Sequence, residues 1–158
     1  GKGQIGFMWT ANSQGSRNMP HIRVVRIDAA TKALIDEPDI WNNTIGFAYP
    51  DACPNDRGDI GVSMLAGGGW LNMSPVVGIR NDADTNWRLR ASVIGTDMPD
   101  GMTAGDYTTV RRQSPGGLTW VASGYSLQGG SDRSNVEPRV VHFGRKGFEP
   151  ATTRWFGV

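Results

Sequence analysis

The sequence Gly58-Asp59-Ile60-Gly61-Val62 recurs in altered form at Gly3-Gln4-Ile5-Gly6-Phe7 and at Gly116-Gly117-Leu118-Thr119-Trp120. Each copy opens a run of strand-like residues, which is followed by a polar loop and then by a proline that opens a second run. These second runs are residues 20–26, 75–80 and 138–143. Repeats of strands at such a spacing are typical of β-propeller blades. The sequence therefore predicts an all-β repeat protein.

The second copy can be written as four strands. They are expected at residues 46–50, 59–66, 75–81 and 87–95, and the next unit opens at 105–110. Residues 88–93 alternate between long polar and apolar side chains, which is typical of a half-buried strand. We thus expect one domain, 1–158, with units of about 3–45, 46–104 and 105–158. The prediction is a propeller-type repeat of about three four-stranded antiparallel blades in an incomplete ring.

The predicted ring is incomplete because the first unit begins at its second strand. Closed propellers have four to eight blades, and an open sheet edge invites association. Two alternatives follow: a homo-oligomer closes the ring, or the chain is part of a longer propeller. In either case the segment Thr153-Arg154-Trp155-Phe156 is expected to supply the missing strand of the first unit.

Composition excludes several classes of partner. The formal net charge is +1, so no strong field favours nucleic acid or an anionic membrane, and no apolar run is long enough for a membrane span. Cys53 is the single cysteine and is interpreted as a structural thiol rather than a nucleophile. The chain begins with Gly, which suggests a processed, excised or trimmed product. We expect a secreted or cell-surface protein.

The segment Ser114-Pro115-Gly116-Gly117-Leu118-Thr119-Trp120 is the most specific string in the chain. It resembles the Asp-box of sialidases and related propellers, although its Asp is absent and its spacing is one residue shorter. Together with Gly-Asp-Ile-Gly-Val-Ser and Pro-Val-Val-Gly-Ile-Arg in the second unit, it resembles the repeat of bacterial secreted sialidase-like propellers. In that family the box is structural, and its Trp packs between sheets. The resemblance implies a fold more than a reaction.

A sialidase-type site would need three arginines around a carboxylate, a Tyr activated by a Glu, and an acidic residue. Arg23, Arg80 and Arg139 occupy the third, fifth and first positions after the repeat prolines, and such positions share one face of a strand. They either converge on a central axis or decorate the outside of the middle strands. Both alternatives stay open.

Polar residues at the predicted innermost strands are the next candidates. Asp106 and Tyr107 open one such strand, and Asp51 lies near the other, so these side chains are expected at a central channel or as turn caps. Glu137 lies beside Arg139, either as a surface ion pair or as a catalytic acid. The catalytic candidates are therefore Asp106, Tyr107, Glu137 and Arg139.

Trp70 follows three glycines and is expected on a long, exposed loop, where its face could stack on a sugar ring. The ligand-binding candidates are Trp70, Asp51, Arg23, Arg80 and Arg139. His21 and His142 are interpreted as packed side chains, so no metal site or cofactor is expected. The turn Asp82-Ala83-Asp84 offers only an incomplete set of calcium ligands.

These observations predict a non-catalytic binding module for a glycan or another extracellular polymer. Two alternatives remain. One is a glycoside hydrolase of sialidase type that another chain completes, and the other is a structural or adhesive repeat. The sequence alone leaves open whether the protein is an enzyme.

Overall fold

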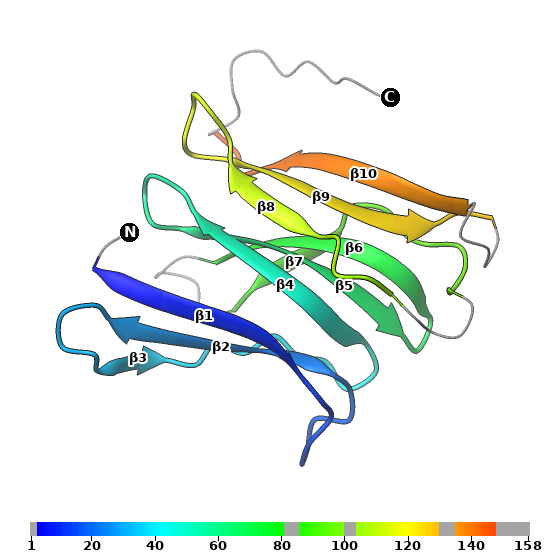
Figure 1. Cartoon of the computed structure of the whole chain (residues 1–158), viewed down its shortest axis with the longest axis horizontal. Helices are drawn as coiled ribbons and strands as arrows, with labels where there is room; N and C mark the ends of the chain where they lie inside the picture. The colour runs from blue at the N-terminus through cyan, green and yellow to red at the C-terminus, as the bar shows by residue number, and fades with distance from the viewer. Residues whose placement is uncertain (1–2, 81–85, 100–103, 130–134, 148–158) are drawn as a thin grey trace.

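The computed structural model describes residues 3–80, 86–99, 104–129 and 135–147. Within these residues the chain forms ten β-strands and no α-helix (Figure 1). The strands are β1 (Gln4–Ala11), β2 (His21–Asp28), β3 (Leu34–Asp36), β4 (Gly46–Pro54), β5 (Ile60–Gly68), β6 (Leu71–Arg80), β7 (Arg88–Ala91), β8 (Thr109–Arg112), β9 (Trp120–Leu127) and β10 (Val136–Phe143). Nothing in this described part could cross a membrane as an apolar helix.

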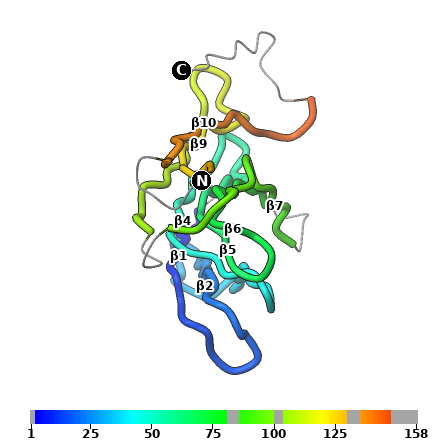
Figure 2. The backbone as a smooth tube through the Cα atoms, turned by 90° about the vertical axis from the view of Figure 1, so that its right-hand side faces the viewer, coloured from blue at the N-terminus to red at the C-terminus, as the bar shows by residue number. Residues whose placement is uncertain are grey.

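The strands form three antiparallel sheets, one in each predicted unit. Sheet 1 has the order β1-β2-β3, sheet 2 the order β4-β5-β6-β7, and sheet 3 the order β10-β9-β8. The sheets stack in sequence order, with sheet 2 in the middle (Figure 1). Their first strands β1, β4 and β8 lie next to one another, and β7 lies on the opposite side of the stack (Figure 2). The fold is thus all-β, and the described residues form no closed ring.

Among the described residues β1 is the first strand of sheet 1, whereas β4 precedes β5 in sheet 2. The segment expected to supply a strand ahead of β1, 153–156, lies outside the described residues. The fourth strand expected after residue 147 lies outside them as well. Sheet 3 accordingly has three described strands.

Three local predictions were wrong. Pro75 and Pro138 were expected to open their strands, but both lie inside them, opposite Leu65 and Tyr125. Pro75 is tolerated because the β6–β7 ladder begins one residue later, at Val76. Trp70 was placed on a long loop, but β5 and β6 are joined by a tight hairpin in which Gly68 pairs with Leu71.

Among the described residues, apolar clusters lie between sheets 1 and 2 and between sheets 2 and 3. Ile22 and Val24 of sheet 1 pack with Val62 and Met64 of sheet 2. Between sheets 2 and 3, Trp120 is completely buried in a cluster with Val77, Val110 and Ala122. A Cβ atom on Gly61 would lie 2.6 Å from the Trp120 ring, so only glycine leaves room for the indole there. Trp120 thus packs between sheets 2 and 3.

The turn between β4 and β5 links sheet 2 to sheet 3 through the buried Asn55. Its Oδ1 accepts hydrogen bonds from the Arg57 and Asp59 amides at 2.9 and 3.0 Å. Its Nδ2 donates to the Leu118 carbonyl at 3.1 Å. The next residue, Asp56, donates its amide to the Gly117 carbonyl. These bonds satisfy the turn internally and anchor it to the loop that precedes β9.

Candidate functional site

A polar groove of about 530 Å³ lies where the first strands of the three sheets meet. We call it the inner-strand groove. It is lined by Thr10 of sheet 1, by Tyr49 and Asp51 of sheet 2, and by Asp106, Thr108 and Arg111 of the chain around β8. Each sheet therefore contributes to one surface, and residues far apart in sequence are brought together there.

A bulge in β4 shapes the middle of this groove. The β4–β5 register shifts between Ala48 and Asp51, and Tyr49 adopts a φ of 57°. Such a φ is strained for a tyrosine and persists only when its surroundings hold it. The Thr10 hydroxyl accepts the Tyr49 amide at 3.0 Å, and the Thr108 hydroxyl donates to the Tyr49 carbonyl at 2.7 Å. The bulge is thus clamped between sheets 1 and 3.

Asp51 joins sheet 2 to sheet 3. Its Oδ2 accepts hydrogen bonds from the Thr109 hydroxyl at 3.0 Å, the Val110 amide at 2.9 Å and the Arg111 guanidinium at 2.6 Å. Burial raises the pKa of this carboxyl, but the hydrogen bonds from Val110, Arg111 and Thr109 outweigh it and hold the pKa below its usual value. Asp51 lines the groove, and its carboxylate already serves the packing of sheets 2 and 3.

The lowered pKa of Asp51 predicts a loss of stability in acid. Its hydrogen bonds stabilise the fold fully above the unfolded-state pKa of an aspartate, about 3.9, and are lost as the pH falls from there through the lower folded-state pKa. We expect Asp51→Asn to be less stable than the wild type at pH 7, and this difference to shrink below about pH 4. Urea denaturation of both proteins from pH 7 down to acid tests this. A difference independent of pH would contradict it.

Asp106 lines the groove, and Tyr107 is the next residue along the chain. They precede β8 rather than belonging to it, which corrects the expected strand start at residue 105. The Asp106 carboxylate makes no hydrogen bond or ion pair within the described part of the chain, and Tyr107 is 78% exposed. The segment that carries them is anchored, because the Tyr125 hydroxyl bonds both the amide and the carbonyl of Gly105. A free carboxylate and an open aromatic face are therefore presented on a fixed backbone.

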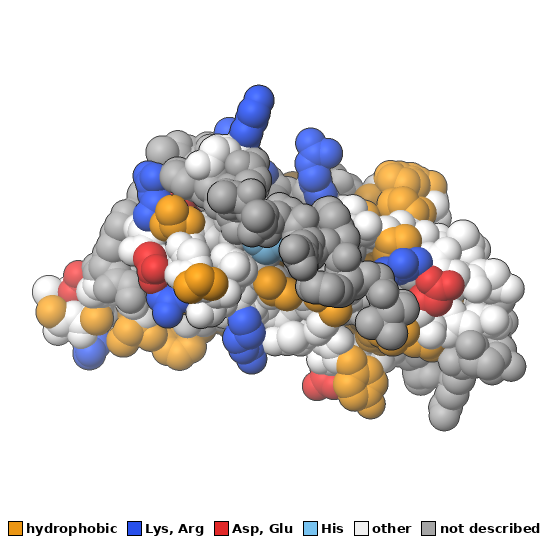
Figure 3. All heavy atoms as spheres, turned by 90° about the horizontal axis from the view of Figure 1, so that it is seen from above, with side chains coloured by type: hydrophobic (Ala, Val, Ile, Leu, Met, Phe, Trp, Pro, Cys, Tyr) orange, Lys and Arg blue, Asp and Glu red, His pale blue; other side chains and the backbone are white. Residues whose placement is uncertain are grey.

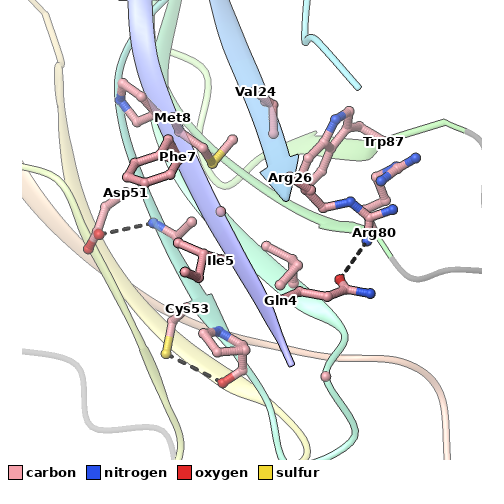
Figure 4. A pocket seen from close by; sticks show the side chains of 16 residues that line it. Gln4, Ile5, Phe7, Met8, Val24, Arg26, Asp51, Cys53, Arg80 and Trp87 are labelled. Carbon is pink, nitrogen blue, oxygen red and sulfur yellow. Dashed lines mark hydrogen bonds between the residues drawn. The ribbon is translucent and has the colours of Figure 1, made fainter. Parts of the chain in front are cut away.

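An apolar pocket of about 330 Å³ adjoins the groove, and Pro50 and Asp51 line both. We call it the β1–β4 pocket. Figure 4 shows Asp51 and Cys53 on one side of β1 and the Arg26, Arg80 and Trp87 side chains on the other. Cys53 is partly buried and packs against the core between sheets 2 and 3, consistent with a structural thiol.

At this pocket the Arg80 side chain joins two sheets. Its Nη2 binds Asp36 of β3 at 3.0 Å, and its guanidinium lies 6.0 Å from the Trp87 ring. Arg26 binds both oxygens of the same carboxylate. The Arg26 hydrogen bond lowers the pKa of Asp36, burial opposes it, and Arg80 lowers it further. Arg80 thus ties sheet 2 to sheet 1.

The three predicted arginines do not share a partner or a cavity among the described residues. Arg23 binds Glu37 and Asp39, both at 2.9 Å, beside a groove at the β1–β2 hairpin. Arg139 pairs with Glu137 on the outer strand β10, and both are exposed. Because each arginine has an acid within its own sheet or the adjoining one, local pairing replaces the expected convergence on an axis.

Trp70 is 77% exposed at the tip of the β5–β6 hairpin and lines none of these cavities. Asp51 and Asp106, two of the candidates chosen from the sequence, line the same groove, whereas the other groove residues were not chosen. Thr10, Tyr49 and Arg111 carry no motif of their own. The sequence could have pointed to them only through their positions on or near the predicted innermost strands, close to Asp51 and Asp106.

No group of three or more His, Cys, Asp or Glu side chains in the described ranges could hold a metal ion. The turn Asp82-Ala83-Asp84, the one weak calcium candidate, lies outside those ranges.

Comparisons with known proteins bear on the fold alone. No protein-family model matches the sequence, and no curated protein matches it significantly. The chain is similar to the crystal structure of a protein of unknown function from Dyadobacter fermentans DSM 18053, with a TM-score of 0.56 and 10% sequence identity. The match covers 92% of this chain and 36% of that one. The chain therefore spans little more than a third of that protein.

Proposed function

We propose that the three sheets are blades of a propeller-type protein that binds a polyhydroxylated polymer, such as a glycan, without transforming it. The proposal rests on the exposed Tyr107 ring next to the Asp106 carboxylate, which has no hydrogen bond or ion pair with any described residue. Both residues lie on an anchored segment. An aromatic face can stack on the C–H face of a sugar, and a carboxylate accepts hydrogen bonds from its hydroxyls. A secreted or cell-surface location belongs to the same proposal, because such polymers are abundant there.

The groove supports binding better than hydrolysis. A general acid in a glycosidase needs a carboxyl whose pKa is raised toward neutrality. In the described part of the chain, the resolved shifts in carboxyl pKa, at Asp28, Asp36 and Asp51, are all downward. Glu137 and Arg139, two of the catalytic candidates, pair with each other on β10 and do not line the groove.

A glycan array with neutral and acidic oligosaccharides tests the proposal, followed by calorimetry with the probe that binds best. We expect Tyr107→Ala to weaken binding about tenfold, the equivalent of about 1.4 kcal/mol, because the stacking face is removed. Asp106→Asn should weaken it less, since the amide still hydrogen-bonds. Trp70→Ala is the matched control, because that aromatic ring is equally exposed but lies outside the groove.

Three results would contradict the proposal. An array without any binding would favour a purely structural repeat. Binding that Trp70→Ala removes and Tyr107→Ala leaves unchanged would place the site at the β5–β6 hairpin. Release of free sugar from a bound oligosaccharide, lost on Asp106→Asn, would favour the hydrolase alternative.

A further inference from the structure

The face of sheet 1 that points away from sheet 2 carries exposed apolar side chains, and no other sheet packs on it among the described residues. Two of these side chains, Ile5 and Phe7, also border the β1–β4 pocket at the edge of the sheet. Met8 of β1 packs into the core against sheet 2, so its neighbours Phe7 and Trp9 point to the other face. Ile5, Phe7 and Trp9 are 37%, 54% and 44% exposed. These three side chains define the sheet-1 outer face. A patch of this kind on a folded protein marks an interaction surface.

The repeat indicates what this face is built to meet. Phe7, Val62 and Trp120 occupy the same position in the three copies of the repeat. Val62 is completely buried against sheet 1, and Trp120 is completely buried against sheet 2. In both cases the side chain packs on the sheet that comes before its own in the stack. Phe7 has the same orientation, but no sheet precedes sheet 1 among the described residues.

At the other end of the stack, sheet 3 also has an exposed apolar side chain on its outer face. Val77 and Val140 are the second residues after Pro75 and Pro138 and are therefore equivalent. Val77 is 8% exposed because sheet 3 covers it. Val140 alternates with Val141, which packs toward sheet 2, so Val140 points away from sheet 2 and is 72% exposed. We call the surface around it the sheet-3 outer face. Hydrophobic side chains are visible at this end of the molecule, seen from above in Figure 3.

We propose that a second copy of this chain places its sheet-3 outer face on the sheet-1 outer face. The contact would repeat between chains the packing that the chain makes twice within itself. It is head to tail, so it either closes into a ring or continues without end. Two copies would bring six sheets together, and six is the only multiple of three within the four to eight blades of closed propellers.

This inference rests on the propeller part of the proposed function, but not on ligand binding. In such a ring β1, β4 and β8 of both copies would face a common axis, because these strands lie side by side in each chain. The inner-strand groove of one copy would then be continued by that of the other. A bound polymer would meet two equivalent sites.

Light scattering on the eluate of a sizing column measures the mass in solution. We expect the full chain to have twice its own mass of 17.1 kDa. Phe7→Asp and Val140→Asp should each reduce the mass to that of one chain, because a carboxylate would be buried unpaired in the contact. Trp70→Asp is the control: it adds the same charge at an exposed aromatic residue outside both faces and should leave the mass unchanged.

A mixture of the two variants tests the head-to-tail geometry. Phe7→Asp chains keep an intact sheet-3 outer face, and Val140→Asp chains keep an intact sheet-1 outer face. One of the two contacts can therefore form between them, and the mixture should regain a dimer that neither variant forms alone. Circular dichroism identical to the wild type shows that each variant is folded.

The wild-type chain at 17.1 kDa over the whole concentration range would overturn the proposal. So would a dimer that neither substitution disturbs, or a mixture that stays monomeric. Oligosaccharide binding by a monomer would leave the proposed function standing while this inference fails. A dimer that binds no oligosaccharide would leave this inference standing while the proposed function fails.

Discussion

Trp120→Ala should lower the free energy of unfolding by about 4 kcal/mol, the cost typical of removing a fully buried aromatic side chain. Trp120 is completely buried between sheets 2 and 3, stacks on Phe143 with a centroid distance of 5.6 Å, and donates its Nε1–H to the Cys53 carbonyl at 2.8 Å. The substitution would open a cavity and leave that carbonyl without its donor. Domains of this size are stable by about 5–15 kcal/mol in total, so the loss approaches global unfolding.

Urea denaturation followed by circular dichroism measures this loss. Trp70→Ala is the matched control, since Trp70 is 77% exposed and its removal should change stability by less than about 0.5 kcal/mol. Gly61→Val sharpens the test. Alone it should destabilise the protein, because a Cβ atom there meets the indole at 2.6 Å. In the Trp120→Ala background it should restore part of the loss by filling the cavity. Additive effects of the two substitutions would show that Gly61 and Trp120 are not packed as described.

Asn55→Ala should cost about 3 kcal/mol, because several buried polar groups lose their partners at once. Asn55 is 5% exposed and Asp59 is 7% exposed. The side-chain oxygen of Asn55 accepts two backbone amides of its own turn, and its amide group donates to the Leu118 carbonyl in the neighbouring unit. The substitution therefore weakens both the turn and the junction of sheets 2 and 3.

Asn42→Ala is the matched control for Asn55→Ala. The Asn42 side chain also caps a turn, with its oxygen accepting the Thr44 and Ile45 amides at 2.9 and 3.1 Å. That turn is exposed, so water replaces the lost bonds and the cost should stay below about 1 kcal/mol. Equal losses for the two variants in urea denaturation would refute the importance of burial at Asn55.

The strands themselves were predictable because each depends on short-range signals. The run Ile60-Gly61-Val62 opens β5, and its counterpart at residues 5–7 lies at the start of β1. The third copy, residues 118–120, leads into β9, which begins at Trp120. The alternation at residues 88–93 predicted β7. Hairpin order followed from the same repeat. Turn details were less accessible. The tight turn at Gly68 and Gly69, with φ of 106° and 60°, depends on backbone angles that a run of glycines permits without requiring.

The candidate site was only half predictable. Asp51 and Asp106 were chosen for their places on innermost strands, and both do line the inner-strand groove. Their chemical states could not be read from sequence. The Asp51 carboxylate is satisfied by residues 109–111, whereas the Asp106 carboxylate has no hydrogen bond in the described ranges, although both are aspartates that line the same groove. The three arginines were expected to act together, yet nearby acids hold each of them separately.

The division between sequence and tertiary structure follows the range of the forces involved. Alternating side chains, turn residues and a repeat of hairpins are local properties, and they were sufficient to predict three antiparallel sheets, whose first strands are β1, β4 and β8. Which carboxylate stays free, which arginine is neutralised and which tryptophan is buried depend on packing between sheets. The Trp120 ring packs on Gly61, and the Val110 amide donates a hydrogen bond to the Asp51 carboxylate. In both contacts the two residues are about 60 positions apart in the chain. No local pattern encodes such a contact, because burial and desolvation arise only when two distant surfaces meet.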